Sequence, residues 1–305
     1  MSGKFERVCM AALLTLLMGC ERDFDIDIKQ GDPLLVVEAY INNELPLHNY
    51  VVLSRSQDYY SPNFAGTPVS GATVTITEGD LQPDRTIRWD ATTRKLLKEA
   101  TLPQLQNTLL PGVYFDTMLA TNPSRALMGK PGKYYLLEIT EGKQNYSAVT
   151  NLLQPIPIDS VTSGFHFLDI EDGDTIPKAR ITVHYKDPDT LGNTVLYYWN
   201  QYHTRDNFGW GGLSTNRYSP NTDDLVNGQY IRLTHNNEFG ISDSVDYYLV
   251  NVDREVYNFW DSFNKARNNE GPFSTPVSLR SNIQGRDVTG CFSGFSISTK
   301  TIEIK

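Results

Sequence analysis

The densest group of side chains that could bind a metal ion is the acidic segment Asp169-Ile-Glu-Asp-Gly-Asp174. Hard cations such as Ca²⁺ bind several oxygen ligands that converge from one tight loop, and Asp169, Glu171, Asp172 and Asp174 could supply them. The glycine falls one position early for the helix-loop-helix calcium pattern. A solvated turn between strands explains the segment more simply, because Asp and Gly favour turns. We therefore expect no metal site and keep these four residues as a weak candidate loop.

A second candidate is an aromatic strand followed by a glycine-rich loop. Residues 197–202 read Tyr-Tyr-Trp-Asn-Gln-Tyr, and residues 207–212 read Asn-Phe-Gly-Trp-Gly-Gly. Such a loop can hold aromatic rings at the surface, where they stack on sugars or anchor a protein partner. The alternative is that the rings face the core and the glycines only make a turn. We expect Tyr197 and Trp199 in the core. The candidate ligand- or partner-binding residues are Tyr202, Phe208 and Trp210.

The sequence lacks the short motifs of common enzymes. It has no Gly-x-Ser-x-Gly elbow, His-Glu-x-x-His zinc helix, phosphate-binding loop or dinucleotide fingerprint. The histidines lack the short spacings that local metal pairs favour. They are His48, His166, His184, His203 and His235. A triad assembled from distant segments stays open, because its members need not be neighbours in sequence. We expect a protein that is not an enzyme, with no catalytic residue and no cofactor.

The N-terminal segment has the features of a secretory signal. Lys4 and Arg7 precede the apolar run Val8–Met18, which is too short to cross a bilayer. The segment ends in Leu17-Met-Gly-Cys20, which resembles a bacterial lipobox. This resemblance implies cleavage before Cys20, a lipid on its thiol and a mature protein anchored to a membrane. The alternative is a secreted protein in which Cys20 is only the first mature cysteine.

The charge and the cysteine content indicate which partners and covalent bonds the protein can have. The formal net charge is −9 and the basic residues are scattered, which argues against nucleic acid as a partner, because its backbone needs a basic face. Cys9 would leave with the signal and Cys20 would carry lipid, so no intramolecular disulfide can form. Cys291 lies beside Phe292 and Phe295, where we expect a small buried hydrophobe rather than a reactive thiol.

Short strands separated by Gly and Pro turns predict a mainly all-β fold. We expect a signal peptide at residues 1–19 and a lipidated tether at residues 20–32. The strand pattern of residues 33–154 predicts a β-sandwich of immunoglobulin or transthyretin type. The pattern of residues 155–305 predicts a second β-rich domain. The boundary contains two prolines, which stiffen the chain and remove backbone donors. The expected strands are Leu34–Ile41, Val51–Ser54, Ala72–Thr77, Thr86–Trp89, Gly112–Phe115, Lys133–Thr140, Tyr146–Thr150, Ala179–Tyr185, Val195–His203, Gln229–Thr234, Val245–Val252, Cys291–Ser298 and Thr301–Ile304.

One amphipathic helix is expected near residues 253–268. Its apolar residues recur at helical spacing on one face, with Asp253 as the N-cap and Asn268 at the stop. These apolar residues are Val256, Phe259, Trp260 and Phe263. An apolar stripe of this kind usually packs on a hydrophobic core, and we expect this one to pack on the second sheet. The alternative is that the stripe binds a partner.

The order of several motifs resembles a known family. The motifs include Leu35-Val-Val-Glu-Ala-Tyr-Ile41, Pro68-Val-Ser-Gly-Ala-Thr-Val74, Pro131-Gly-Lys-Tyr-Tyr135, Pro157-Ile-Asp-Ser160 and Gly290-Cys-Phe-Ser-Gly-Phe295. Together with the lipobox, they resemble the outer-membrane lipoproteins of Bacteroidota that form domain-of-unknown-function family 4249 (DUF4249). Members of that family are often encoded beside TonB-dependent receptors. The resemblance implies an accessory to outer-membrane uptake and carries no catalytic residue onto this sequence.

These observations lead to one expected function and two alternatives. We expect a non-catalytic lipoprotein of the outer membrane that binds or docks to a TonB-dependent transporter. Acidic residues after Cys20 resemble an export signal of surface lipoproteins, so exposure on the cell surface stays open. The alternatives are a surface hydrolase that acts on a polymer and a structural or adhesion protein of the envelope. A small-molecule or glycan ligand is left unidentified by the sequence.

Overall fold

β-Strands dominate the computed structural model, which describes residues 32–57, 67–102, 108–171, 174–202, 219–222, 226–269 and 277–305. Pro33–Lys305 form one compact unit, distinct from Met1–Asp32. The strands up to residue 151 are β1 (Leu35–Asn42), β2 (Tyr50–Arg55), β3 (Thr73–Leu81), β4 (Ile87–Trp89), β5 (Lys95–Leu102), β6 (Thr108–Phe115), β7 (Tyr134–Glu141) and β8 (Gln144–Asn151). The later strands are β9 (Ile158–Glu171), β10 (Asp174–Lys186), β11 (Thr194–Tyr202), β12 (Ser219–Thr222), β13 (Tyr230–Thr234), β14 (Phe239–Gly240), β15 (Ser244–Val252) and β16 (Val288–Glu303). The expected all-β fold is confirmed.

Helical segments are few and short in the described part of the chain. They are α2 (Met118–Thr121), α3 (Arg254–Arg267) and the 3₁₀ turns η1 (Pro46–His48), η2 (Ala91–Thr93) and η4 (Pro123–Arg125). Helix α3 is the amphipathic helix expected from the sequence. Its N-cap is Asp253, whose Oδ1 accepts the N–H of Val256 at 2.8 Å. No helix among the described residues is both long and apolar enough to span a bilayer.

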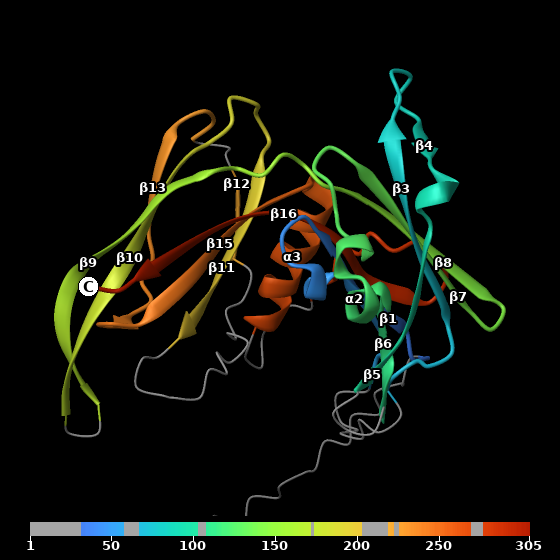
Figure 1. Ribbon diagram of the computed structural model, residues 1–305, viewed down its shortest axis with the longest axis horizontal. Coiled ribbons are helices and arrows are strands. Elements are labelled where there is room, and N and C mark those ends of the chain that lie inside the picture. The colour runs from blue at the N-terminus through green and yellow to red at the C-terminus, as the bar shows by residue number, and fades with distance from the viewer. Residues whose placement is uncertain are drawn as a thin grey trace, which may run out of the picture. The chain divides into compact units, whose positions relative to one another are not determined.

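The strands form two sheets (Figure 1). The larger, 12-stranded sheet has the order β12-β11-β15-β16-β1-β2-β6-β5-β3-β7-β8, with β4 paired to β3. The smaller, 4-stranded sheet has the order β13-β10-β14, with β9 paired to β10. The larger sheet therefore runs through both regions that the sequence assigns to separate domains. The division near residue 154 stays a prediction.

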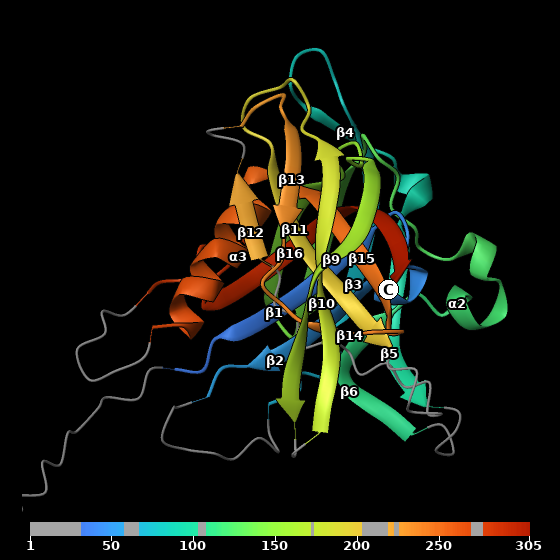
Figure 2. The ribbon, with the colours of Figure 1, turned by 90° about the vertical axis from the view of Figure 1, so that its left-hand side faces the viewer.

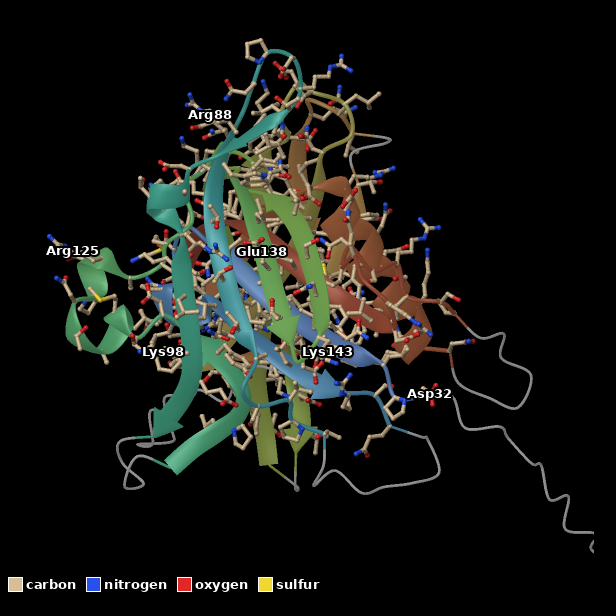
Figure 3. All side chains as sticks on the ribbon, turned by 90° about the vertical axis from the view of Figure 1, so that its right-hand side faces the viewer. Asp32, Arg88, Lys98, Arg125, Glu138 and Lys143 are labelled. Atoms are coloured by element: carbon tan, nitrogen blue, oxygen red, sulfur yellow. The ribbon has the colours of Figure 1, made fainter. Side chains whose placement is uncertain are left out.

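The first hydrophobic core lies among β1–β8. Strands β1, β2, β5 and β6 face β3, β7 and β8 across it, and the alternating side chains of each strand fill the space between them. Its largest fully buried side chains include Tyr114 and Tyr135. Phe292 of β16 adds a ring to this core although it comes from the far end of the chain. Figure 3 shows the outer side of this half, where Arg88 and Glu138 lie among solvent-facing side chains.

The last long strand, β16, connects the two halves. It pairs in parallel with β1 and antiparallel with β15. The pattern of the sequence predicts two strands in this region, whereas the structure has one. Gly290 lies opposite Val37 and has a φ of +129°. A Cβ atom at this position would lie 1.9 Å from the carbonyl oxygen of Val37, so only glycine allows the two strands to approach.

The second half has three layers. The smaller sheet packs on one face of β11 and β15, and Trp199, Phe239 and Tyr247 fill the core between them. Helix α3 covers the opposite face of β11, β15 and β16, where Val256 and Phe259 are buried (Figures 1 and 2). The apolar stripe of α3 is therefore used for core packing. The expected burial of Cys291 and Trp199 is also confirmed.

Candidate functional site

His235, Asp253 and Cys291 are titratable groups that lie inside the packed layers and have shifted pKa values. Burial lowers the pKa of His235 to about 4 and raises the pKa of both the Asp253 carboxyl and the Cys291 thiol. His235 is 5% exposed and its Nε2 lies 3.0 Å from the hydroxyl of Tyr247. Asp253 caps α3. Perturbed pKa values can mark active sites, but these groups face other side chains instead of a cleft, so they indicate packing.

The acidic segment lies where β9 turns into β10. Asp169 pairs with Lys178, with Oδ2 2.8 Å from Nζ, and this contact lowers the pKa of the Asp169 carboxyl. Glu171 and Asp174 are backbone partners at the end of the two strands. Asp172 and the side chains of Glu171 and Asp174 lie outside the described part of the structure. Within that part, no group of three His, Cys, Asp or Glu side chains is placed to hold a metal ion.

The aromatic candidates fall at the end of β11 and beyond it. Tyr202 is the last residue of β11 and its side chain is 37% exposed. Partial burial and the nearby carboxylate of Asp246 raise the pKa of the Tyr202 hydroxyl. Phe208 and Trp210 lie outside the described residues, as does the predicted lipidation site Cys20. The structure therefore places Tyr202 at the surface, and only this one of the three aromatic candidates lies among the described residues.

A cavity of about 290 Å³ opens between β3, the start of β5 and β7, a site that the sequence does not indicate. Ile76, Leu127 and Tyr135 form its apolar floor. Glu78 and Lys130 line its rim, and their charges pair at 2.8 Å. Ligand sites commonly have volumes of about 300–1,000 Å³, so this cavity of about 290 Å³ lies just below that range.

The outer wall of the cavity is held in place by a buried carboxylate. Asp116 Oδ1 accepts the N–H of Met118 at 3.0 Å, and Oδ2 accepts the N–H of Leu127 at 2.8 Å. Lys95 Nζ lies 3.5 Å from Asp116 Oδ2 and donates to the carbonyl of Arg125 at 2.8 Å. Figure 3 shows Arg125 on this segment, away from the strands. These contacts hold the wall through protein groups of the chain itself.

The other surface feature is a two-stranded ribbon at the end of the smaller sheet. We call residues 168–170 of β9 and 175–177 of β10 the β9–β10 ribbon. Leu168 is 70% exposed and Ile170 is 74% exposed. Single exposed apolar residues are common, but two on the same strand and the same face make a patch. The sequence does not indicate this patch, because the exposure of a strand face depends on which other elements of the fold pack on it.

The architecture defines an all-β protein with two sheets and one packed helix, whose described surface offers an apolar ribbon and a small cavity. Comparison with known families gives a more specific assignment. The chain matches the family described as Domain of unknown function (DUF4249) over residues 21–301. The chain therefore belongs to the DUF4249 family, as the order of its motifs indicates. No curated protein matches the chain.

Proposed function

We propose that this chain is a non-catalytic lipoprotein of the bacterial outer membrane that docks to a TonB-dependent receptor and assists uptake. The proposal combines the lipobox-like end of the signal segment with the binding surfaces of the folded unit. The receptor as partner, the outer-membrane location and a Bacteroidota origin all belong to this proposal.

The observation that carries the proposal is the short distance along the chain from Cys20 to the folded unit. That unit begins at Pro33, so only residues 21–32 separate it from the predicted lipid. At about 3.3–3.6 Å per residue, these residues extend to roughly 40 Å at most. The folded unit of a chain anchored at Cys20 therefore starts within this distance of the bilayer, beside proteins embedded in it. The net charge of −9 leaves the acyl chains, and not attraction to anionic lipid, as the anchor.

The arrangement of the folded unit also favours binding over chemistry. Its strongly perturbed histidine and cysteine are buried among aromatic and aliphatic side chains. Its exposed features are an apolar ribbon and a cavity whose rim charges are paired. Such surfaces suit recognition of a protein or a small ligand.

Replacing Cys20 by serine tests the anchor. We expect Cys20→Ser to reduce the amount of the protein in the outer-membrane fraction at least about tenfold, because serine cannot carry a thioether-linked lipid and the remaining tether has no apolar anchor. Immunoblots of separated outer-membrane, inner-membrane and soluble fractions measure the change. Cys9→Ser is the matched control, since it makes the same substitution within the signal segment but outside the lipobox. A Cys20→Ser protein found in the outer membrane at the wild-type level would contradict the proposal.

A further inference from the structure

The cavity beside β3 is the open end of the first hydrophobic core. Ile76 and Tyr135 belong to that core, and Leu127 closes it from the outer wall. Glu78 follows Ile76 on the same face of β3, because alternate residues of a strand share a face. The side chain of Glu78 is 14% exposed, so a largely buried carboxylate lies where the apolar floor ends. A ligand in this cavity would meet apolar side chains at one end and charged groups at the other.

The charged groups at the opening of the cavity balance one another. Lys130 Nζ lies 2.8 Å from Glu78 Oε2, and Lys95 Nζ lies 3.5 Å from Asp116 Oδ2. Arg125 lies at the outer edge of the wall, away from the strands (Figure 3). A ligand with a single net charge would leave one of the paired groups without its counter-ion, which is costly for a carboxylate or an ammonium group that is largely shielded from water. The balance therefore favours a ligand that has no net charge.

The partners of Glu78 indicate which of its contacts a ligand can replace. The side chain of Lys130 is 62% exposed, and Lys133 Nζ lies 3.7 Å from the other carboxylate oxygen of Glu78. An exposed lysine gains little from such a pair, because it loses side-chain freedom and is screened by salt. The ammonium group of a ligand can therefore take the place of Lys130 beside Glu78. Lys130 and Lys95 both line the cavity, so their ammonium groups can then contact an anionic group of the same ligand.

Charge strength and volume define the ligand further. Hydrogen bonds between ionised groups are about twice as strong as those between neutral groups. A zwitterion therefore gains more from Glu78 and the two lysines than an uncharged polar ligand does. The cavity volume of about 290 Å³ limits the ligand to roughly ten non-hydrogen atoms, if each takes about the 30 Å³ of a liquid water molecule.

We propose that this cavity binds a small zwitterion with an apolar side chain, of the size of a free α-amino acid. The ammonium group of the ligand contacts Glu78, and its carboxylate contacts Lys95 and Lys130. Its side chain lies on the apolar floor. This site goes beyond the proposed function, because it involves neither the membrane anchor nor the receptor.

Binding of L-leucine to the full chain, purified in detergent, tests the site. Two analogues carry the same branched side chain and a single charge: 4-methylpentanoate lacks the ammonium group, and 3-methylbutylamine lacks the carboxylate. We expect isothermal titration calorimetry to show saturable binding of leucine, at least about tenfold tighter than that of either analogue. Leucine that does not bind, or an analogue that binds within about threefold of leucine, would overturn the proposal. Either result leaves the proposed receptor contact unaffected, since no receptor takes part in the measurement.

Replacing Glu78 by glutamine tests the contact with the ammonium group. Glu78→Gln removes the carboxylate and leaves the opening with an excess of positive charge. Leucine should bind at least about tenfold more weakly than to the wild type, and 4-methylpentanoate should then bind more tightly than leucine. Glu138→Gln is the matched control, because Glu138 pairs with Arg94 on the outer side of β7. If Glu78→Gln binds leucine as tightly as Glu138→Gln does, the assignment of Glu78 is wrong.

Filling the cavity gives a test that changes no charge. Ala126 lines the cavity, whereas Ala120 is exposed on α2. Ala126→Trp should weaken leucine binding at least about tenfold, because the indole takes up space that the ligand needs. Ala120→Trp should bind leucine like the wild type, and thermal unfolding of both variants verifies that they are folded. A folded Ala126→Trp protein with the wild-type affinity would show that leucine binds elsewhere, which would overturn the proposal.

Discussion

Gly290→Ala is expected to lower the free energy of unfolding by about 4 kcal/mol or more, among the largest effects of any single substitution. The added Cβ would lie 1.9 Å from the carbonyl oxygen of Val37 and 2.7 Å from its backbone nitrogen. Both contacts are with backbone, so no side-chain rotation relieves them. The strands β1 and β16 would have to separate, although their paired segments fill both the first core and the core beneath α3. Urea unfolding followed by circular dichroism measures the loss, with an expected decrease of the midpoint by about 1 M or more.

Gly142→Ala is the matched control for the glycine prediction. Gly142 has a φ of +57°, and a Cβ there would meet nothing within 4 Å. This variant carries only the backbone cost of a positive φ, about 1 kcal/mol. A Gly290→Ala protein as stable as Gly142→Ala would mean that β1 and β16 do not approach as closely as described.

His235 should make the protein less stable as the pH falls from 7 to 5. Burial among Tyr197, Trp199 and Tyr247 lowers its pKa from 6.5 to about 4, so the folded state disfavours the charged imidazolium. A histidine with a depressed pKa contributes its full stability above the unfolded pKa and loses it as the pH falls toward the folded pKa. For these two pKa values, linkage gives a loss of about 2 kcal/mol between pH 7 and pH 5.

The contribution of His235 is measured by difference, because carboxyl groups titrate in the same pH range. His235→Gln keeps a polar partner for Tyr247 and removes the titration, so its free energy of unfolding should fall by about 2 kcal/mol less than that of the wild type over this range. Equal pH dependence of His235→Gln and the wild type would show that His235 is not buried in its neutral form.

The sequence predicts best the strands in which apolar and polar residues alternate. Strand β10 shows Ile181, Val183 and Tyr185 at every second position, and α3 combines an N-cap with a helical apolar stripe. By contrast, β5 mixes Lys, Leu and Glu without strict alternation, and β9 is interrupted by Gly164 and a bulge. Their pairing depends on neighbouring strands and not on local pattern.

Long-range contacts explain why β16 could not be predicted in full. The motif Gly290-Cys-Phe-Ser-Gly-Phe295 indicates a buried strand, but not its parallel partner β1. Glycine is needed at position 290 because Val37 lies so close to it. At position 294, a Cβ atom would lie 2.6 Å from the carbonyl oxygen of Asn151. Neither contact can be deduced from residues that are near in sequence.

The candidate sites were predictable only in part. The acidic segment is expected as a turn, and the structure describes its two ends, Asp169–Glu171 in β9 and Asp174 in β10. The apolar ribbon beside it was not predicted, because Leu168 and Ile170 resemble core residues until the elements that pack on the smaller sheet are known. The cavity was missed because Asp116 joins segments that no sequence motif connects.

Affinity purification of the wild-type chain from detergent-solubilised outer membranes tests the central claim most directly. We predict that the chain is recovered with lipid on Cys20, by intact mass, together with a TonB-dependent barrel in comparable amount. A chain recovered without lipid from the soluble fraction, or an anchored chain recovered without any such barrel, would contradict the account.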